Sequence, residues 1–262
     1  MTSPRRLGVA TPLAVIGAAL LVLPVVALVQ RAPWSDVADV LGDDAVRTAL
    51  RLSLTASLGA TAVAAMVGFP LAWVLARRDF AGRRVVRALV LVPLVLPPVV
   101  GGVALLLAFG RRGLVGQLLD DWFGVTLPFT LAGAVLAEAF VALPFLVLSA
   151  EAAFRNLDPR YEDAARTLGA RPMITTWRVV VPLTWPSLAA GLVLAWARAL
   201  GEFGATITFA GNAPGRTSTV PLQVYLLLES GRLDGAIVLS VALLAVSVGV
   251  LVALRDRWLG AL

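Results

Sequence analysis

Long apolar stretches recur along the whole chain and are separated by short polar segments. Several approach or exceed the roughly 20 residues that a helix needs to cross a bilayer. This pattern predicts an all-α polytopic membrane protein with six transmembrane helices. The expected spans are at about residues 9–29, 45–76, 85–109, 130–150, 184–210 and 235–254.

The first apolar stretch has two interpretations. Arg5 and Arg6 precede it, as basic residues precede the core of a secretory signal. However, the stretch is longer than a usual signal core and contains Pro12 and Pro24. We therefore expect an uncleaved first helix and a polar linker over residues 1–44, followed by the main transmembrane domain over residues 45–255.

The third stretch is rich in helix-breaking residues, among them Pro93, Pro97 and Pro98. Proline removes a backbone donor and kinks a helix, which a membrane tolerates only where neighbours or a cavity satisfy the freed groups. A kinked packing helix and a pore-lining helix both fit this pattern. Residues 111–129 are expected to form a loop with a short interfacial segment at 118–123.

Composition narrows the possible chemistry. The 262 residues include no cysteine and no histidine. Disulfides and thiolate metal sites are therefore excluded, and the commonest metal ligand and general base is missing. We expect no metal site and no catalytic residues. With 59% hydrophobic and 15% charged residues, the chain leaves no room for a separate soluble domain.

Arginine supplies all 22 basic residues, and its distribution predicts the topology. Six spans put both termini on one side of the membrane. Fourteen arginines lie near that side and seven near the other, so the positive-inside rule makes the N- and C-termini cytoplasmic. The net charge of +6 therefore fits topology better than nucleic-acid binding. The 14 are Arg5, Arg6, Arg77, Arg78, Arg83, Arg84, Arg87, Arg155, Arg160, Arg166, Arg171, Arg178, Arg255 and Arg257.

The cytoplasmic loop at 151–178 contains a predicted free-standing helix. Asp158 is a good N-cap, Pro159 suits the first helical position, and Gly169 suits the left-handed residue that ends a helix. The helix would be roughly 15 Å long and marginal alone. It could lie on the lipid surface or dock on another protein. Its apolar side would comprise Leu157, Tyr161, Ala164, Ala165 and Leu168.

This segment resembles a known motif. The segment is similar to the EAA motif of ABC-importer permeases, although Asp163 replaces the usual Glu. The matching residues are Asp163, Ala164, Ala165 and Gly169, followed by Val179, Val181 and Pro182. The resemblance implies a type I ABC importer transmembrane-domain fold in which the helix couples to a cytoplasmic ATPase. The implied coupling residues are Tyr161, Glu162, Asp163, Ala164, Ala165, Arg166, Leu168, Gly169 and Pro182.

Two further segments carry unusual polar residues. Arg198 and Glu202 are four residues apart in the fifth span, so they share a helix face and can neutralise each other. They could fix subunit packing or lie near a gate. Together with Thr206 and Glu138 they are our candidate path residues. The following loop has the Gly, Asn and Pro of a turn, and also offers Asn212, Arg216 and Thr217 as possible anion contacts at an outer mouth.

Residues 198–206 and 210–219 closely resemble the molybdate permease subfamily. Residues 135–148 also look like this subfamily, although we would expect Gln where this chain has Glu138. The resemblance implies a homodimeric importer subunit in the bacterial cytoplasmic membrane, with two ATPase partners and an extracytoplasmic molybdate-binding protein. Tungstate permeases look alike, and sulfate permeases differ in the loop. The chain has no lysine and therefore no Gly-x4-Gly-Lys-Ser/Thr phosphate loop. We therefore expect ATP and magnesium to bind the partner ATPase, and we expect this chain to bind no cofactor.

A rival of a different class is an ion-coupled secondary transporter. It would use Glu138, Arg198 and Glu202 to couple ions. Such a carrier needs no docking helix, so the cytoplasmic segment argues against it.

Overall fold

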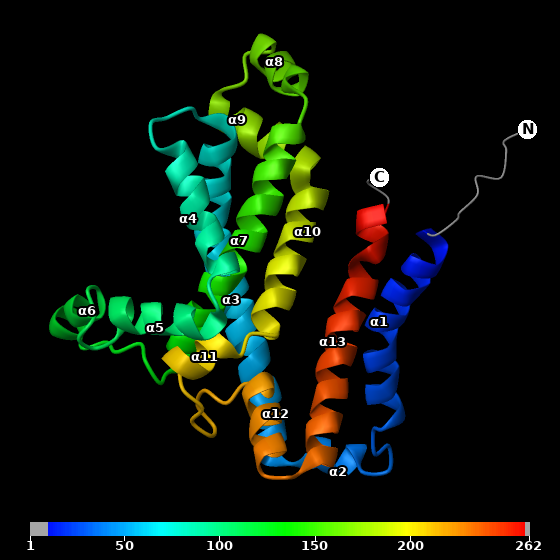
Figure 1. Ribbon diagram of the computed structural model, residues 1–262. Helices are drawn as coiled ribbons and strands as arrows, with labels where there is room; N and C mark the ends of the chain where they lie inside the picture. Colours follow the sequence, from blue (N-terminus) through cyan, green and yellow to red (C-terminus); the bar gives the residue numbers. More distant parts are fainter. Residues whose placement is uncertain (1–9, 260–262) are drawn as a thin grey trace, which may run out of the picture.

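The computed structural model describes residues 10–259 (Figure 1). Arg5 and Arg6, used in the topology prediction, lie outside these residues, as do the side chains of Arg255 and Arg257. Over the described residues the fold is entirely helical, as expected. The helices are α1 (Ala10–Gln30), α2 (Val37–Gly42), α3 (Asp44–Arg77), α4 (Arg83–Val95), α5 (Pro98–Phe109), α6 (Gly116–Phe123), α7 (Leu131–Asn156), α8 (Pro159–Thr167), α9 (Pro172–Thr175), the π-helical turn η1 (Thr176–Val180), α10 (Val181–Leu200), α11 (Gly204–Phe209), α12 (Val220–Glu229) and α13 (Leu233–Leu259).

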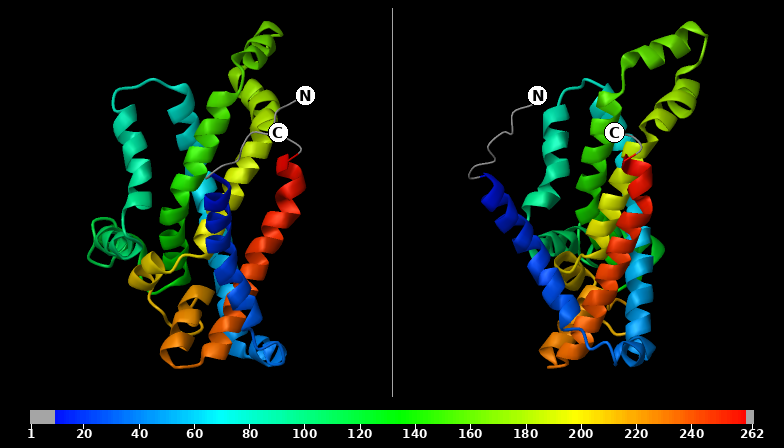
Figure 2. Two further views of the ribbon diagram at one scale, coloured as in Figure 1. Left: turned by 45° about the vertical axis from the view of Figure 1, so that its right-hand side comes forward. Right: turned by 90° about the vertical axis from the view of Figure 1, so that its right-hand side faces the viewer.

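Five of the helical segments are long and apolar enough to cross a membrane. They are Thr11–Gln30, Asp44–Arg77, Leu131–Asn156, Pro172–Leu200 and Leu233–Val250. The start of α1 and the end of α13 point toward the end of the molecule that carries α8 (Figures 1 and 2). The opposite end carries α2 and α12.

The third apolar stretch is not one helix. The chain is extended at Leu96 and Pro97, so α4 ends at Val95 and α5 begins at Pro98. Because a residue before proline avoids the helical conformation, two consecutive prolines turn the expected kink into a break. Figure 1 shows α5 running across the direction of α4. The prediction of a continuous span over 85–109 was wrong for this reason.

The fifth span also differs from its predicted bounds of 184–210. Its helix already begins at Pro172 and ends at Leu200, and residues 204–209 form the separate helix α11. Much of the expected loop 151–178 is therefore helical, since α7 also continues to Asn156. Helices α2 and α12 were not predicted, whereas α6 covers the expected interfacial segment.

The core lies where α3, α7 and α10 pack together. Ala56, Ala60 and Ala64 of α3 are fully buried, because small side chains let helix backbones approach in a membrane. Gly191 of α10 serves the same purpose: a Cβ there would lie 2.8 Å from Ser149 Cβ of α7. These three helices form the frame on which the shorter ones rest.

Two glycines let α5 and α11 pack with their backbones in contact. A Cβ at Gly102 would lie 2.5 Å from Thr208 Cβ and 3.0 Å from the Ala205 carbonyl oxygen. A Cβ at Gly204 would lie 2.6 Å from Pro98 Cβ. The two broken helices thus meet each other, and α11 packs on α7 through Ala205 and Phe209.

We expect Gly102→Ala to force α5 and α11 apart and to destabilise the fold by about 1–3 kcal/mol, the usual cost of overpacking. The matched control is Gly249→Ala in α13, where a Cβ meets nothing within 4 Å and helix propensity favours alanine. The measurement is the midpoint of thermal unfolding in detergent. Equal midpoints for the two variants would contradict the close contact.

Candidate functional site

Helix α8 has the local structure that its sequence predicts. The Asp158 carboxylate accepts a hydrogen bond from the Arg160 amide at 2.9 Å, and Pro159 occupies the first turn. The helix ends with Leu168 as its C-cap, and Gly169 follows with φ +81°, a conformation that glycine adopts without strain. Capping alone therefore sets where α8 begins and ends.

The predicted apolar side of α8 is only partly covered by this chain: Leu157, just before the helix, packs against the buried cluster that contains Phe154. No residue of α8 is buried. Tyr161 is 53% and Leu168 89% exposed, whereas Glu162 and Ala165 are half-buried and face the bundle. The adjoining α9 and η1 add exposed Met173, Ile174 and Trp177. We call these exposed apolar residues the α8–α9 surface: Tyr161, Leu168, Met173, Ile174 and Trp177.

A chain of contacts connects α8 to the core through α3. The Glu162 carboxylate forms an ion pair with Arg77 Nη2 at 2.6 Å. The Arg77 guanidinium lies 5.4 Å from the centre of the Trp73 ring, within cation–π range. Trp73 in turn meets Phe154 of α7 edge-on, with ring centres 5.1 Å apart. These contacts connect α8 to α3 directly and to α7 through Trp73.

The other predicted coupling residues have more local contacts. Asp163 is exposed and pairs with Arg166 at 3.4 Å, and Arg166 also lies 3.7 Å from Glu162. Ala164 is exposed. Pro182 lies at the start of α10, directly after the π-helical turn η1, within one continuous helical segment. A cavity of about 580 Å³ lies below α8, between Arg77, Glu162, Arg166 and α9.

We expect Arg77→Gln to loosen α8, because it removes the charged partner of a largely buried carboxylate. We expect the loss of this ion pair to cost about 1.4 kcal/mol, so the amides of α8 should exchange with deuterium roughly tenfold faster. Arg178→Gln is the control, since Arg178 is exposed on η1. Similar exchange in both variants would show that Arg77 does not hold α8.

The Arg198–Glu202 pair forms at a break in the helix rather than inside it. Arg198 Nη2 lies 2.6 Å from Glu202 Oε2, and Glu202 Oε1 accepts a hydrogen bond from the Ala205 amide at 2.8 Å. Glu202 is 1% exposed. Since α10 ends at Leu200, this carboxylate joins the last turn of α10 to the first turn of α11.

Two more buried polar groups lie near this break. Glu138 of α7 is 2% exposed, its Oε2 has no hydrogen-bond partner within the described chain, and it interacts electrostatically with Glu202. Thr206 of α11 is fully buried, and its hydroxyl also lacks a partner there. Arg198 alone among the four predicted path residues keeps exposed side-chain surface. This burial favours a packing role for the other three over direct contact with a cargo.

Breaking the pair should have unequal effects. Arg198→Gln leaves a buried carboxylate without its counter-charge, which costs about 3–5 kcal/mol. Glu202→Gln leaves the partly exposed Arg198 and should cost clearly less. Thermal unfolding in detergent measures the difference. Equal losses of stability would show that burial does not distinguish the two partners.

The predicted outer-mouth residues differ in their exposure: Thr217 is buried, Asn212 is half-buried and Arg216 is exposed. Thr217 is fully buried. Its hydroxyl accepts from the Ala213 amide at 2.9 Å and donates to the Gly211 carbonyl, so it closes the loop on itself. Asn212 is half-buried, with its Oδ1 enclosed and unpaired within the described chain. Arg216 is exposed and is the predicted residue free to meet an anion.

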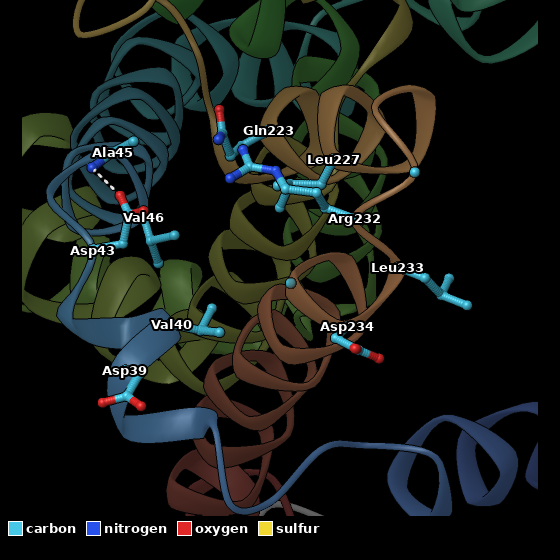
Figure 3. A pocket seen from close by; sticks show the side chains of 12 residues that line it. Asp39, Val40, Asp43, Ala45, Val46, Gln223, Leu227, Arg232, Leu233 and Asp234 are labelled. Atoms are coloured by element: carbon cyan, nitrogen blue, oxygen red, sulfur yellow. Dashed lines mark hydrogen bonds between the residues drawn. The ribbon is translucent and has the colours of Figure 1, made fainter.

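At this end the structure also has a cavity that sequence reasoning missed. It has a volume of about 510 Å³ and lies between α2, the start of α3, α12 and the start of α13 (Figure 3). Asp39, Arg232 and Asp234 line it, and Asp43 there caps α3 by accepting from the Ala45 amide at 2.7 Å. Because α2 and α12 were not predicted, nothing in the sequence indicated that these residues meet.

The fold belongs to a known structural class. A bacterial ABC transporter that imports the acidic polysaccharide alginate has a TM-score of 0.73 at 19% identity, with 95% of this chain and 93% of that chain covered. The MetNI methionine ABC transporter, in an inward-facing conformation, has a TM-score of 0.59 at 16% identity, with coverage of 83% and 94%. The arrangement described above is therefore that of an ABC-importer membrane domain.

Sequence comparison identifies the family. Residues 68–262 match the binding-protein-dependent transport system inner membrane component, and the chain belongs to this family. The molybdenum transport system permease protein ModB of Mycobacterium tuberculosis is 44% identical over 244 residues, covering 93% of this chain and 92% of that protein. ModB of Escherichia coli K12 is 43% identical over 215 residues, with coverage of 80% and 92%.

Proposed function

We propose that this chain is the membrane-spanning subunit of an ATP-driven importer that carries molybdate across the bacterial cytoplasmic membrane. The observation that carries the cargo assignment is the 44% identity to a molybdenum permease over nearly the full length of both proteins. The exposed α8–α9 surface supports the ATP-driven mechanism, because it offers an uncovered site for a partner at one end of the bundle.

The proposed topology has six crossings. The five long helices supply five of them, and the broken segment α4–α5 supplies the sixth, since α4 alone has 13 residues, fewer than the roughly 20 of a full helical crossing. Residues 1–44 would contribute the first crossing and the outer linker, and residues 45–255 the transmembrane domain. Both termini and α8 would face the cytoplasm. The arginine excess near that side supports this orientation.

Energy would enter through α8. Two ATPase subunits, which bind ATP and magnesium, dock on the α8–α9 surfaces of two copies of this chain and move them when they close. The Glu162–Arg77 pair passes that movement to α3, and the Trp73–Phe154 contact passes it to α7. The chain itself hydrolyses no ATP and holds no cofactor.

The cargo path would form between the two copies. A binding protein delivers molybdate to the outer end, near the loop that carries Arg216. Guanidinium groups suit tetrahedral oxyanions because their donors form a planar fork. Arg216 and the exposed part of Arg198 are therefore the proposed cationic contacts, whereas Glu138, Glu202 and Thr206 maintain the helix break around them. None of the contacts described above favours tungstate import, sulfate import or ion-coupled transport over ATP-driven import of molybdate.

The docking of the ATPase is tested with Leu168→Asp, which puts a charge on the α8–α9 surface without touching the core. We expect loss of ATPase co-purification and of uptake, because an unpaired charge in an apolar interface is costly. The control is Leu114→Asp, which changes a residue that is 85% exposed in the turn between α5 and α6. Normal ATPase binding by Leu168→Asp would refute the docking surface.

The cargo assignment is tested on the partner binding protein by calorimetry with molybdate, tungstate and sulfate. We expect tight binding of molybdate and much weaker binding of sulfate. In cells, molybdate uptake should depend on this chain and on ATP. A binding protein that prefers sulfate would overturn the assignment.

A further inference from the structure

A basic pocket lies where the turn between α3 and α4 meets the end of α7. Its volume is about 500 Å³. Four arginines line it, three from the start of α4 and one from the end of α7: Arg83, Arg84, Arg87 and Arg155. None of the proposed coupling or path residues lines it. The turn lies at the end of the molecule that carries α8 (Figure 1).

The positive charge of this pocket is only partly balanced. Arg83 pairs with Asp79 and donates to the Leu75 carbonyl at 2.6 Å. Arg87 and Arg155 share a single carboxylate, the buried Glu151. Arg84 is exposed and forms no hydrogen bond or ion pair with the described chain. Four guanidinium groups therefore meet two carboxylates, and the pocket can accept an anion without displacing an existing pair.

The backbone at the start of α4 adds to this potential. The helix begins after Gly82, whose φ is +89°, and it has no acidic residue in its first turn and no side-chain cap. The first amides of a helix point outward and favour negative charge. In most helices an Asp, Ser or Thr side chain satisfies them. Here the Arg83 amide donates to the Phe80 carbonyl at 3.2 Å, and no side chain caps the amides that follow it.

An uncovered apolar stripe leads away from the pocket along α4. Val85, Leu89, Val92 and Val95 are spaced four and three residues apart, so they share one face of the helix. Their exposed fractions are 62%, 62%, 39% and 82%. Val85 belongs to both the stripe and the pocket. Figure 2 shows α4 at the outer edge of the bundle, where lipid can reach it.

We propose that this pocket and stripe bind one anionic phospholipid, with its phosphate headgroup among the arginines and an acyl chain along α4. A free phosphate or other small anion would fill the pocket but leave the stripe bare, whereas a neutral lipid would leave the charge unbalanced. Clusters of basic residues beside a transmembrane helix recognise anionic headgroups in this way. Assignment to the inner leaflet rests on the proposed orientation of α8.

The test uses the purified full-length chain, stripped of lipid in detergent and titrated with palmitoyl-oleoyl phosphatidylglycerol. Native mass spectrometry counts the bound lipid. We expect Arg84→Gln to weaken phosphatidylglycerol binding about fivefold, the effect of one arginine near a membrane surface. Leu89→Ser should weaken it as well by shortening the apolar stripe. Phosphatidylcholine should bind weakly and equally to all variants.

The matched control is Arg112→Gln, which removes an exposed arginine outside the pocket. Equal phosphatidylglycerol affinity in the Arg84 and Arg112 variants would overturn the proposal, and so would displacement of the lipid by an equal concentration of inorganic phosphate. Because the chain has no cysteine, Leu89→Cys is a unique thiol. A disulfide between two copies at this position would show that the second copy covers the stripe, which also overturns the proposal.

This experiment does not involve transport. Loss of lipid specificity with intact molybdate uptake would refute only the lipid site. Intact lipid binding in a chain that carries no molybdate would refute only the proposed function.

Discussion

The close approach of α3, α7 and α10 is the constraint on which the rest of the structure depends. Lipid provides no hydrophobic force to hold apolar helices together, so small residues must let their backbones come into contact. Ala56, Ala60 and Ala64 provide this on α3, and Gly191 provides it against Ser149. Three functional elements are attached to this frame: α8 through Arg77, α11 through Ala205 and Phe209, and α12 through the Val220 amide, which donates to Ser53 at 2.7 Å.

Helix breaks concentrate polar groups at one level of the fold. Each break frees backbone donors and acceptors that a membrane would penalise. At these breaks α5 packs against α11 through Gly102 and Gly204. The Glu202 carboxylate accepts a hydrogen bond from the Ala205 amide. Arg198 then neutralises Glu202. The charged residues of the fifth span thus stabilise an interrupted backbone, which explains why Glu202 is so deeply buried.

Local signals in the sequence were sufficient for some elements and misleading for others. Asp158, Pro159 and Gly169 predicted α8 nearly to the residue, because caps and a positive φ are local properties. The prolines at 97 and 98 indicated a disturbance, but hydrophobicity alone could not distinguish a kink from a break. The segment from Pro172 to Arg178 was expected to belong to a loop, although it is helical and continues directly into α10.

The candidate site was predictable only in part. Arg198 and Glu202 were expected to pair because four residues separate them on a helix. The pairing of Glu162 with Arg77 joins segments far apart in the chain, so no spacing rule could reveal it. The same limit applies to the basic pocket, since Arg155 reaches it from α7 while the other three arginines come from α4. Tertiary packing alone brings these groups together.

Attachment of α8 by a charged pair instead of a buried apolar face has a mechanical consequence. An apolar interface resists tilting because tilting exposes it to water. A guanidinium and a carboxylate can rotate about each other while they stay in contact. The Glu162–Arg77 ion pair can therefore transmit a linear displacement of α8 to the end of α3, but it transmits little rotation. A motor bound to α8 could swing through an arc while the membrane helices received only its linear displacement.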